Sequence, residues 1–358
     1  MMKGVLGADR NTQVRTLPVS DGGDGLLEAV GAALPGTMMR SQVHGPVPGQ
    51  RVNARWFRPA NGEIAVIEMA EAAGLLLVPQ HRRNPAMTTT YGVGELMMAV
   101  VREGFRRVII GIGGSATNDG GAGMAQALGI RLLDKSGREL PPGGAALRAL
   151  DRIETGGIVP AIQSVEWIVA SDVGNPLCGP RGATMVYAPQ KGATGDDIGL
   201  LEEGLGRFAD IIERDQGVSV RDLPGAGAAG GLGAGLLAFC GATVRPGIDI
   251  VLEMIGYDRH MHESDVVLTG EGRLDAQTGF GKAVHGVVQR SQVHGKPVLG
   301  VFGQIDQELG PEEIRKDFSL VETLVDSSTS PETAMREAAQ LLEMKTRNLF
   351  TLYVHSSA

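Results

Sequence analysis

The sequence predicts an α/β protein built on parallel sheets, and three observations support this prediction. Short apolar runs end abruptly in polar glycine loops, and helical stretches lie between these runs. The chain also holds 53 glycines in 358 residues, with only 4% aromatic residues. Alternating strands and helices are typical of parallel α/β sheets. An excess of glycine indicates positive φ, or backbone that approaches a ligand closely.

Six apolar runs are predicted to be buried strands: residues 13–19, 107–110, 165–170, 265–269, 297–302 and 318–325. The predicted helices between them include residues 89–102, 122–128, 196–214, 281–293 and 331–344. Because ligands bind outside the carboxyl ends of parallel strands, the polar loops after these runs are expected to converge on one or two clefts. Residues 52–56 and 64–68 instead predict a hairpin, which indicates an added α+β portion.

Composition narrows the classes of function. The net charge is −8 with acids and bases interspersed, whereas a nucleic-acid partner needs a basic footprint on the protein. No stretch of about 18 apolar residues appears, so no membrane span is expected. Cys178 and Cys240 are too few for a disulfide framework and are interpreted as reduced thiols. We therefore expect a cytoplasmic protein with a small-molecule partner.

The glycine block, residues 111–123, carries the strongest functional signal. It lies between a predicted strand and a predicted helix, where backbone N–H groups form an anion cradle at the helix N-terminus. Asp119 in this block could hold Mg²⁺ or accept a hydroxyl proton. The alternative is a structural turn with an Asx cap, but the number of glycines and polar side chains exceeds what a turn needs. The phosphate-binding candidates are Gly113, Gly114, Ser115, Thr117 and Asn118.

A second glycine run, residues 225–230, matches the dinucleotide fingerprint G-x-G-x-x-G. A true fingerprint follows a buried strand, whereas Pro224 stands directly before this one. The run opens a predicted helix, and it serves either phosphate binding, with Gly230 and Gly231, or close helix packing. No Walker A pattern G-x-x-x-x-G-K-S/T occurs, which excludes ordinary P-loop kinases.

Cations and acids gather after the predicted strand 265–269. Glu271, Arg273, Asp275 and Lys282 supply the mixture that phosphoryl transfer needs, namely cations for the charge on the phosphoryl oxygens and carboxylates for Mg²⁺. The alternative is a solvated loop with surface ion pairs. Lys191 is another candidate cation for phosphoryl transfer, with weaker support from the sequence.

Two aspartates follow strand-like runs directly. Asp172 comes after residues 165–170 and is a candidate general base or metal ligand, with a helix or turn cap as a close alternative. Asp21, followed by Gly22 and Gly23, has the same two interpretations.

Taken together, these motifs resemble those of the type-1 glycerate kinase family, from residue 5 to residue 350. The matching stretches are residues 21–25, 66–70, 88–92, 111–123, 175–177, 189–193, 224–235, 245–248 and 269–273. The resemblance implies ATP-dependent phosphorylation of glycerate with Mg²⁺, to 2-phosphoglycerate in many bacterial members and to 3-phosphoglycerate in others. It also implies a flavodoxin-like parallel-sheet domain, residues 1–42 and 258–358, which is split in sequence by a large inserted α/β (α+β) domain, residues 43–257. The active site is then expected in the cleft between the two domains.

One departure from the family concerns the start of the chain. Family members begin with a strand and an Asp-Ser-Phe/Tyr-Lys block, whereas this chain starts inside the helix that follows, at Met1. In the flavodoxin-like order 2-1-3-4-5 that strand is internal, so the strand predicted at residues 13–19 would lack a neighbour. We therefore expect either a wrongly assigned start or a truncated, catalytically impaired homologue.

The resemblance leads to a mechanism with named residues. Nucleotide phosphates lie against the glycine loops, and Mg²⁺ is held by some of Asp119, Asp172 and Asp275. Arg273 or Lys282 binds the carboxylate of glycerate, and an aspartate, Asp172 in preference, accepts the hydroxyl proton. The favoured product is 2-phosphoglycerate.

Two rival functions stay open at this point. A nucleotide-dependent oxidoreductase would rest on residues 225–230, and a non-catalytic homologue would rest on the start of the chain. The oligomeric state is open as well, with a homodimer as one expectation.

Overall fold

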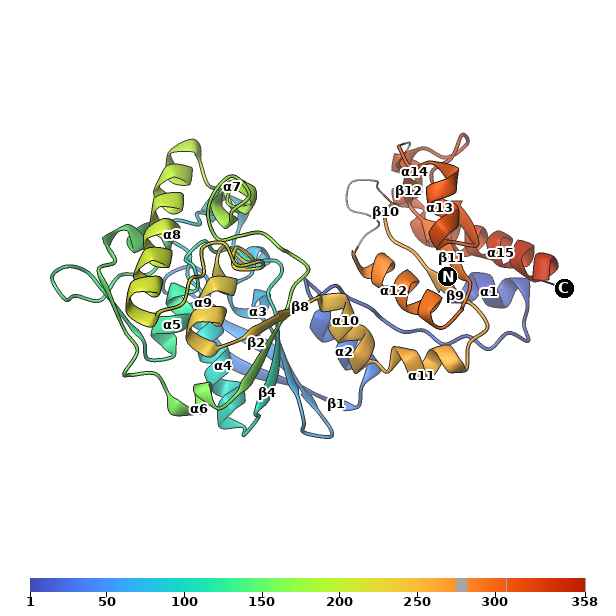
Figure 1. The fold of residues 1–358 in the computed structure, drawn as a ribbon. Helices are drawn as coiled ribbons and strands as arrows, with labels where there is room; N and C mark the ends of the chain where they lie inside the picture. Colours follow the sequence, from blue (N-terminus) through green and yellow to red (C-terminus); the bar gives the residue numbers. More distant parts are fainter. Residues whose placement is uncertain (275–281, 307, 358) are drawn as a thin grey trace. The chain divides into compact units, whose positions relative to one another are not determined.

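The computed structural model describes residues 1–274, 282–306 and 308–357 (Figure 1). The chain forms two compact units, which are described separately. The terminal unit consists of residues 1–19 and 252–358, and the central unit consists of residues 20–251. The sequence predicts domain boundaries at 42/43 and 257/258. These boundaries stay a prediction.

A six-stranded sheet forms the centre of the central unit. The four strands β3, β4, β7 and β8 run parallel, whereas β1 and β2 continue the sheet in antiparallel fashion. The predicted α/β class is thereby confirmed, and so is the predicted hairpin, in which Trp56 and Phe57 pair in antiparallel fashion with Ile67 and Val66. In spatial order the strands are β1 (Gly36–His44), β2 (Arg51–Pro59), β3 (Ala65–Glu68), β4 (Arg107–Gly111), β7 (Glu166–Ala170) and β8 (Thr243–Arg245).

Both faces of this sheet are covered, which is why its inner parallel strands are apolar along most of their length. On one face Ile67 and Ile110 join a core with helices α4 (Tyr91–Arg102), α5 (Ala122–Ala127), α8 (Gly195–Gln216) and α9 (Leu232–Cys240). Val66 and Ile109 point to the opposite face and are buried as well. Helix α2 (Leu26–Ala33) packs on β2 and β3.

Short elements complete the central unit. They are α3 (Ala70–Ala73), β5 (Arg131–Leu133), β6 (Arg152–Glu154), α6 (Pro160–Gln163), α7 (Ala183–Tyr187) and the 3₁₀ turns η1 (Leu75–Leu77), η2 (Gln80–Arg82), η3 (Gly144–Ala149) and η4 (Pro189–Lys191). Helix α10 (Gly247–Met254) begins in the central unit and ends in the terminal unit.

The terminal unit contains a three-stranded parallel sheet in the order β13 (Leu320–Thr323), β11 (Val298–Phe302), β9 (Val267–Thr269). This is the order of the last three strands of a flavodoxin-like sheet. A separate parallel pair joins β10 (Arg273–Leu274) to β12 (Gln304–Ile305). The helices are α1 (Met2–Ala8), α11 (Tyr257–His262), α12 (Lys282–Val293), α13 (Pro311–Asp317), α14 (Pro331–Arg336) and α15 (Ala338–Ser357). Val5 of α1 and Leu349 of α15 share a core with Leu299 of β11.

Two sequence predictions of elements are wrong. Residues 13–19 form no strand and pair with no strand among the described residues. Pro18 lies within this run, and proline has no N–H group to donate to a sheet. The helix predicted at 331–344 is two helices, because α14 ends at Arg336 and α15 starts at Ala338.

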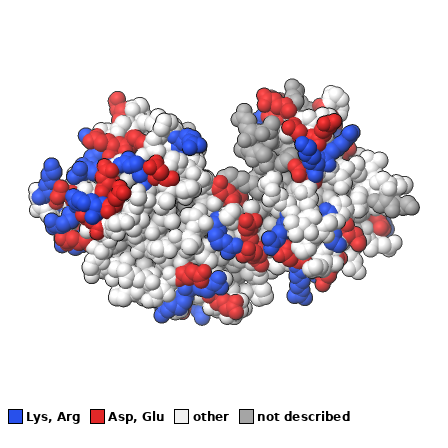
Figure 2. Space-filling model, viewed as in Figure 1, with Lys and Arg blue, Asp and Glu red and all other residues white. Residues whose placement is uncertain are grey.

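The surface agrees with a mixed distribution of charge. On the face drawn in Figure 2, Lys and Arg side chains lie intermixed with Asp and Glu. Among the described residues, we find no helix that combines the length and the apolar character needed to cross a membrane.

Candidate active site

The loops after the parallel strands of the central unit converge at one edge of the sheet, as their position after the strands predicts. The aspartate–glycine loop, residues 20–25, lies against the ends of three strands. A Cβ atom on Gly22 would come within 2.9 Å of the Cβ of Ala170, after which β7 ends, and within 3.0 Å of the Cα of Gly247, which follows β8. A Cβ on Gly113, beyond β4, would lie 2.5 Å from the Cα of Gly23. These glycines are needed because backbone packs directly on backbone.

The two aspartates of this loop have different surroundings. Asp21 is half-buried and its Oδ1 accepts a hydrogen bond of 3.0 Å from the N–H of Gly23, so it shapes its own turn. Asp24 is exposed, and its carboxylate lies where a Cβ on Gly114 would overlap it. The loop therefore presents one carboxylate to solvent beside the glycine block.

Glu68 holds the start of helix α2, directly after this loop, and it is absent from the predicted site. Its Oε1 accepts a 2.6 Å hydrogen bond from the N–H of Leu27 in the first turn of α2. The residue is only 5% exposed, and no other hydrogen bond to its carboxylate is found among the described residues. Burial raises the pKa of Glu68 to about 7, against the lowering effect of the Leu27 N–H. The available signal was an acid at the end of an otherwise apolar run, residues 64–69.

Asp119, predicted as a base or metal ligand, is fully buried and bonded through both carboxylate oxygens. Oδ2 accepts from the N–H and the hydroxyl of Thr90 at 2.8 and 2.9 Å and from the N–H of Gly123 at 3.2 Å. Oδ1 accepts from the N–H of Gly121 at 3.2 Å. Burial raises the pKa of Asp119 and these bonds oppose the rise. This arrangement ties α4 to the start of α5.

Lys191 is buried beneath the glycine block. Its Nζ donates to the hydroxyl oxygen of Ser115 at 2.7 Å and to the carbonyl oxygen of Thr117 at 2.8 Å. Next to these residues, Asn118 donates to the hydroxyl of Thr184 at 3.0 Å. The side-chain oxygens Thr117 Oγ1 and Asn118 Oδ1 are buried and find no hydrogen-bond partner in the part of the chain that the structure describes. The structure therefore brings Ser115, Thr117 and Lys191 together, as the sequence could not show.

The run 225–231 packs against the glycine block. The N–H of Gly120 donates to the carbonyl oxygen of Gly230 at 3.0 Å, and a Cβ on Gly230 would overlap the carbonyl oxygen of Thr117. Gly231 has φ +90° and a Cβ there would lie 2.8 Å from the Cα of Gly120. The element directly before this run is helix α8 and not a strand. Close packing explains these glycines, and a dinucleotide fingerprint lacks its structural context.

Asp172 lies where the sequence predicts it, two residues beyond the end of β7. It is half-buried, and its Oδ1 accepts a 3.0 Å hydrogen bond from the N–H of Gly247. This bond ties the end of β7 to the loop after β8, next to the aspartate–glycine loop.

The remaining predicted residues belong to the terminal unit. Arg273 is exposed and forms a 3.0 Å ion pair with Asp306. Glu271 is half-buried, and its carbonyl oxygen accepts from the N–H of Gly303 at 2.9 Å. Lys282 is the first residue of α12, its side chain is outside the described set, and Asp275 lies outside the described residues. That these residues join those of the central unit in one site stays a prediction.

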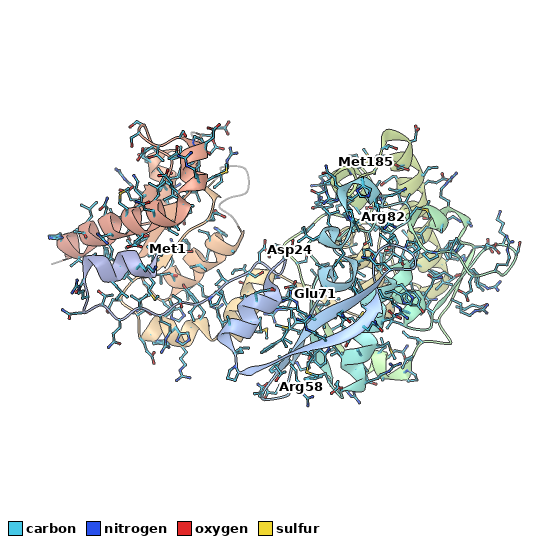
Figure 3. All side chains as sticks on the ribbon, turned by 180° about the vertical axis from the view of Figure 1, so that it is seen from behind. Met1, Asp24, Arg58, Glu71, Arg82 and Met185 are labelled. Carbon is cyan, nitrogen blue, oxygen red and sulfur yellow. The ribbon has the colours of Figure 1, made fainter. Side chains whose placement is uncertain are left out.

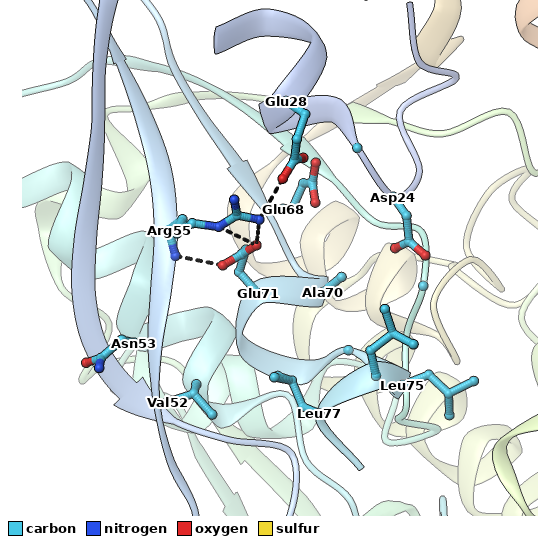
Figure 4. A pocket seen from close by; sticks show the side chains of 14 residues that line it. Asp24, Glu28, Val52, Asn53, Arg55, Glu68, Ala70, Glu71, Leu75 and Leu77 are labelled. Carbon is cyan, nitrogen blue, oxygen red and sulfur yellow. Dashed lines mark hydrogen bonds and ion pairs between the residues drawn. The ribbon is translucent and has the colours of Figure 1, made fainter. Parts of the chain in front are cut away.

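A cavity of about 720 Å³ opens in the central unit beside Gly114. One wall is acidic: Arg55 pairs with Glu71 and, at 2.8 Å, with Glu28, while the carboxylate of Glu68 lies close by (Figure 4). The other wall is apolar and includes Leu75 and Leu77. Asp24 and Glu71, both labelled in Figure 3, line this cavity from the aspartate–glycine loop and from helix α3. The sequence singled out none of these cavity side chains as site residues.

The donor set for a divalent metal is sparse. Among residues 1–274, 282–306 and 308–357, no three His, Cys, Asp or Glu residues gather into a metal-binding group. Both oxygens of Asp119 are engaged, so Asp119 does not fit as a ligand. Asp172 remains as a carboxylate at the edge of the sheet, and one or two carboxylates suffice for Mg²⁺ that is also bound to phosphates.

Comparison with known proteins supplies the family. The sequence model of the glycerate kinase family matches residues 1–354. Glycerate kinase of Halalkalibacterium halodurans is 45% identical over 342 residues, which cover 95% of this chain and 89% of that protein. Glycerate 2-kinase of Escherichia coli (strain K12) is 45% identical over 300 residues, with 84% and 78% covered.

A solved structure agrees with the sequence comparisons. The crystal structure of glycerate kinase 2 from Salmonella typhimurium LT2 matches with a TM-score of 0.84 and 39% identity, covering 99% of this chain and 93% of that one. These findings give no support to an oxidoreductase or to a truncated, impaired homologue. The chain belongs to the glycerate kinase family.

Proposed function

We propose that this protein transfers the terminal phosphoryl group of ATP to a hydroxyl group of glycerate, giving 2-phosphoglycerate and ADP. Family membership supports the reaction, and the relative named glycerate 2-kinase supports the position of the phosphate. The observation that carries the proposal is the direct packing of Gly22, Gly113 and Gly247 backbone at one sheet edge, next to the cavity. The N–H groups of Gly22 and Gly247 donate within the protein, to Ser20 and Asp172, so the glycine block at this edge is proposed to supply the donors to a phosphate.

The groups of this site are proposed to have three different roles. The glycine block, with Gly113, Gly114 and Ser115, offers hydrogen-bond donors to phosphate oxygens. Asp172 accepts the proton of the attacking hydroxyl as the oxygen–phosphorus bond forms and ADP leaves. Arg273 and Lys282 of the terminal unit are proposed to bind the carboxylate of glycerate.

Mg²⁺ is proposed to enter with ATP. Phosphate oxygens of the nucleotide would occupy most of its coordination positions. Asp172 would be a metal ligand as the alternative to its role as the base, whereas Asp119 is left out because it is fully buried. When bound, the ion neutralises charge that develops on the phosphate oxygens. We also propose a cytoplasmic location and a homodimer, and gel filtration tests the homodimer.

The test is turnover of the purified chain with ATP, MgCl₂ and D-glycerate. We expect ADP to appear only when glycerate is present, and phosphorus NMR should identify 2-phosphoglycerate as the product. Absence of glycerate-dependent ADP would overturn the proposal, and 3-phosphoglycerate would overturn the assignment of the hydroxyl.

The role of Asp172 has its own test. Asp172→Asn should lower kcat by about 10² to 10⁴, the usual contribution of a general base. Exposed Asp222 offers a control, since Asp222→Asn should leave kcat unchanged. A kcat for Asp172→Asn within about threefold of the wild type would exclude base catalysis by this residue.

A further inference from the structure

Lys191 has an unusual position for a lysine. It is 2% exposed, and its Nζ lies 2.7 Å from the hydroxyl oxygen of Ser115 and 2.8 Å from the carbonyl oxygen of Thr117. Lysine is almost never fully buried unless it is paired. Because Lys191 is covered by protein, it meets a ligand only through the residues that it touches.

The contact with Ser115 determines where the serine hydrogen points. A lysine ammonium has three donors and no acceptor, whereas a hydroxyl has one hydrogen and two lone pairs. Ser115 Oγ must therefore accept from Lys191, and its own hydrogen must point elsewhere. No acceptor for this hydrogen is found among the described residues, although Ser115 is only 8% exposed. A buried donor without an acceptor indicates a missing partner.

The position of Ser115 identifies the kind of partner. Ser115 follows exposed Gly114 and half-buried Gly113 at the surface of the glycine block. A donor at this place, with an ammonium group behind it, fits an oxyanion such as a phosphate oxygen.

We propose that Lys191 is a positioning residue, which holds the Ser115 hydroxyl as a hydrogen-bond donor to a phosphate group bound at the glycine block. The inference rests on the proposed function for the identity of that phosphate, the nucleotide. It assigns Lys191 no contact with substrate and no proton transfer to it.

Protonation of Lys191 gives the arrangement a dependence on pH. Burial lowers the pKa of Lys191 to about 7, and the negative charge of Asp119 is the charge that opposes this lowering. Neutral Lys191 can accept the serine hydrogen, which turns the donor away from the phosphate. Phosphate affinity should therefore fall as pH rises through the pKa of Lys191, and a bound phosphate should raise that pKa.

A double-mutant cycle tests the proposal. Ser115→Ala and Lys191→Met should each lower kcat/KM for ATP by about 10- to 100-fold, the usual effect of a hydrogen bond to a charged group. If Lys191 acts through Ser115, Lys191→Met in the Ser115→Ala background should cost at most about threefold more. If the two single losses of kcat/KM multiplied in the double variant, the proposal would be overturned. Ser115→Thr, which keeps a hydroxyl, should retain most of the activity.

A binding measurement separates this inference from the proposed function. Affinity for ADP is measured by calorimetry between pH 6 and pH 9 for the wild type and for Ser115→Ala, which leaves Lys191 in place. We expect the wild type to lose affinity above about pH 7 and Ser115→Ala to lack this loss. The same loss in both proteins would overturn the inference, whether or not glycerate is phosphorylated. Because this measurement does not use Lys191→Met, it tests the inference even if that variant fails to fold.

Discussion

At the scale of single residues, two buried acids of the central unit show how surroundings assign a role. Asp119 has both oxygens engaged by backbone and hydroxyl donors. Glu68 has one bonded oxygen, and its carboxylate lies at the cavity wall. The sequence favoured Asp119 as a functional residue because it stands in the glycine block. Its main partner, Thr90, lies 29 residues upstream, and no local pattern reveals that pairing.

Replacing Glu68 should change the dependence of stability on pH. Its pKa of about 7 in the fold lies above the ordinary value of 4.5. A carboxyl group whose pKa is raised on folding makes the folded protein less stable as the pH rises from the pKa of the unfolded state through that of the folded state. Glu68→Gln has no such loss, so its stability should rise by about 3 kcal/mol relative to that of the wild type between pH 4.5 and pH 8. Urea unfolding of both proteins at these pH values measures the difference.

Leu76 provides the control for this experiment, because it lines the same cavity, is 90% exposed and carries no ionisable group. Leu76→Ala should change the free energy of unfolding by the same amount at pH 4.5 and pH 8. A pH-independent difference between Glu68→Gln and the wild type would contradict the raised pKa.

Replacing Asp119 should separate a structural role from metal binding. Asparagine offers its donor group to N–H and O–H groups that are themselves donors, so Asp119→Asn should lower the free energy of unfolding by about 2 to 3 kcal/mol. The concentration of Mg²⁺ needed for half-maximal activity should stay the same. If the Mg²⁺ requirement rose many-fold while the unfolding midpoint stayed constant, Asp119 would be a metal ligand after all.

At the scale of elements, the longer parallel strands were predicted within about one or two residues, because each is a short apolar run bounded by glycine or charge. The parallel strands β8, β10 and β12 were not predicted, because two or three residues are too short to form such a run. β4, β7 and β11 follow this pattern. β1 escaped prediction because it lies at the edge of the sheet and most of its side chains are not buried. Glycine is informative for the same reason as the apolar runs: it marks places where the fold leaves no room for a side chain.

Glycine at position 247 should be irreplaceable for the site. A Cβ there would overlap the carbonyl oxygen of Asp21, so Gly247→Ala should displace the aspartate–glycine loop. We expect a loss of about 1 to 3 kcal/mol in stability, as for other overpacked positions, together with a fall in kcat/KM. Gly174→Ala is the matched control, because a Cβ at Gly174 meets nothing within 4 Å. Equal activity of the two variants would refute the close packing of these loops.

At the scale of the whole molecule, the chain passes from one compact unit to the other at residues 19/20 and 251/252. The segment 13–19 leads to the first of these crossings, and the sequence predicted it as a buried strand because it stands directly before a polar glycine loop. A strand needs a neighbour to pair its backbone groups. None of the described residues supplies one to this segment.

Hydrogen exchange distinguishes the two interpretations of residues 13–19. The backbone N–H groups of this segment donate to no acceptor among the described residues, so they should exchange at close to the rate of an unfolded chain. Those of β4, at the centre of its sheet, should exchange at least about 10³-fold more slowly. Protection of residues 13–19 comparable to that of β4 would mean that the segment pairs as a strand.

What the sequence by itself determined is the α/β class, the longer parallel strands, several helices and the family, because periodicity, glycine positions and motif order are local properties of the chain. Only the tertiary structure decided which partners those residues meet. The bond from Lys191 to Ser115 spans 76 positions, and the bond from Leu27 to Glu68 spans 41. Such contacts arise when packing of the sheet and its helices brings distant loops to one edge, and no local pattern encodes the distance between them.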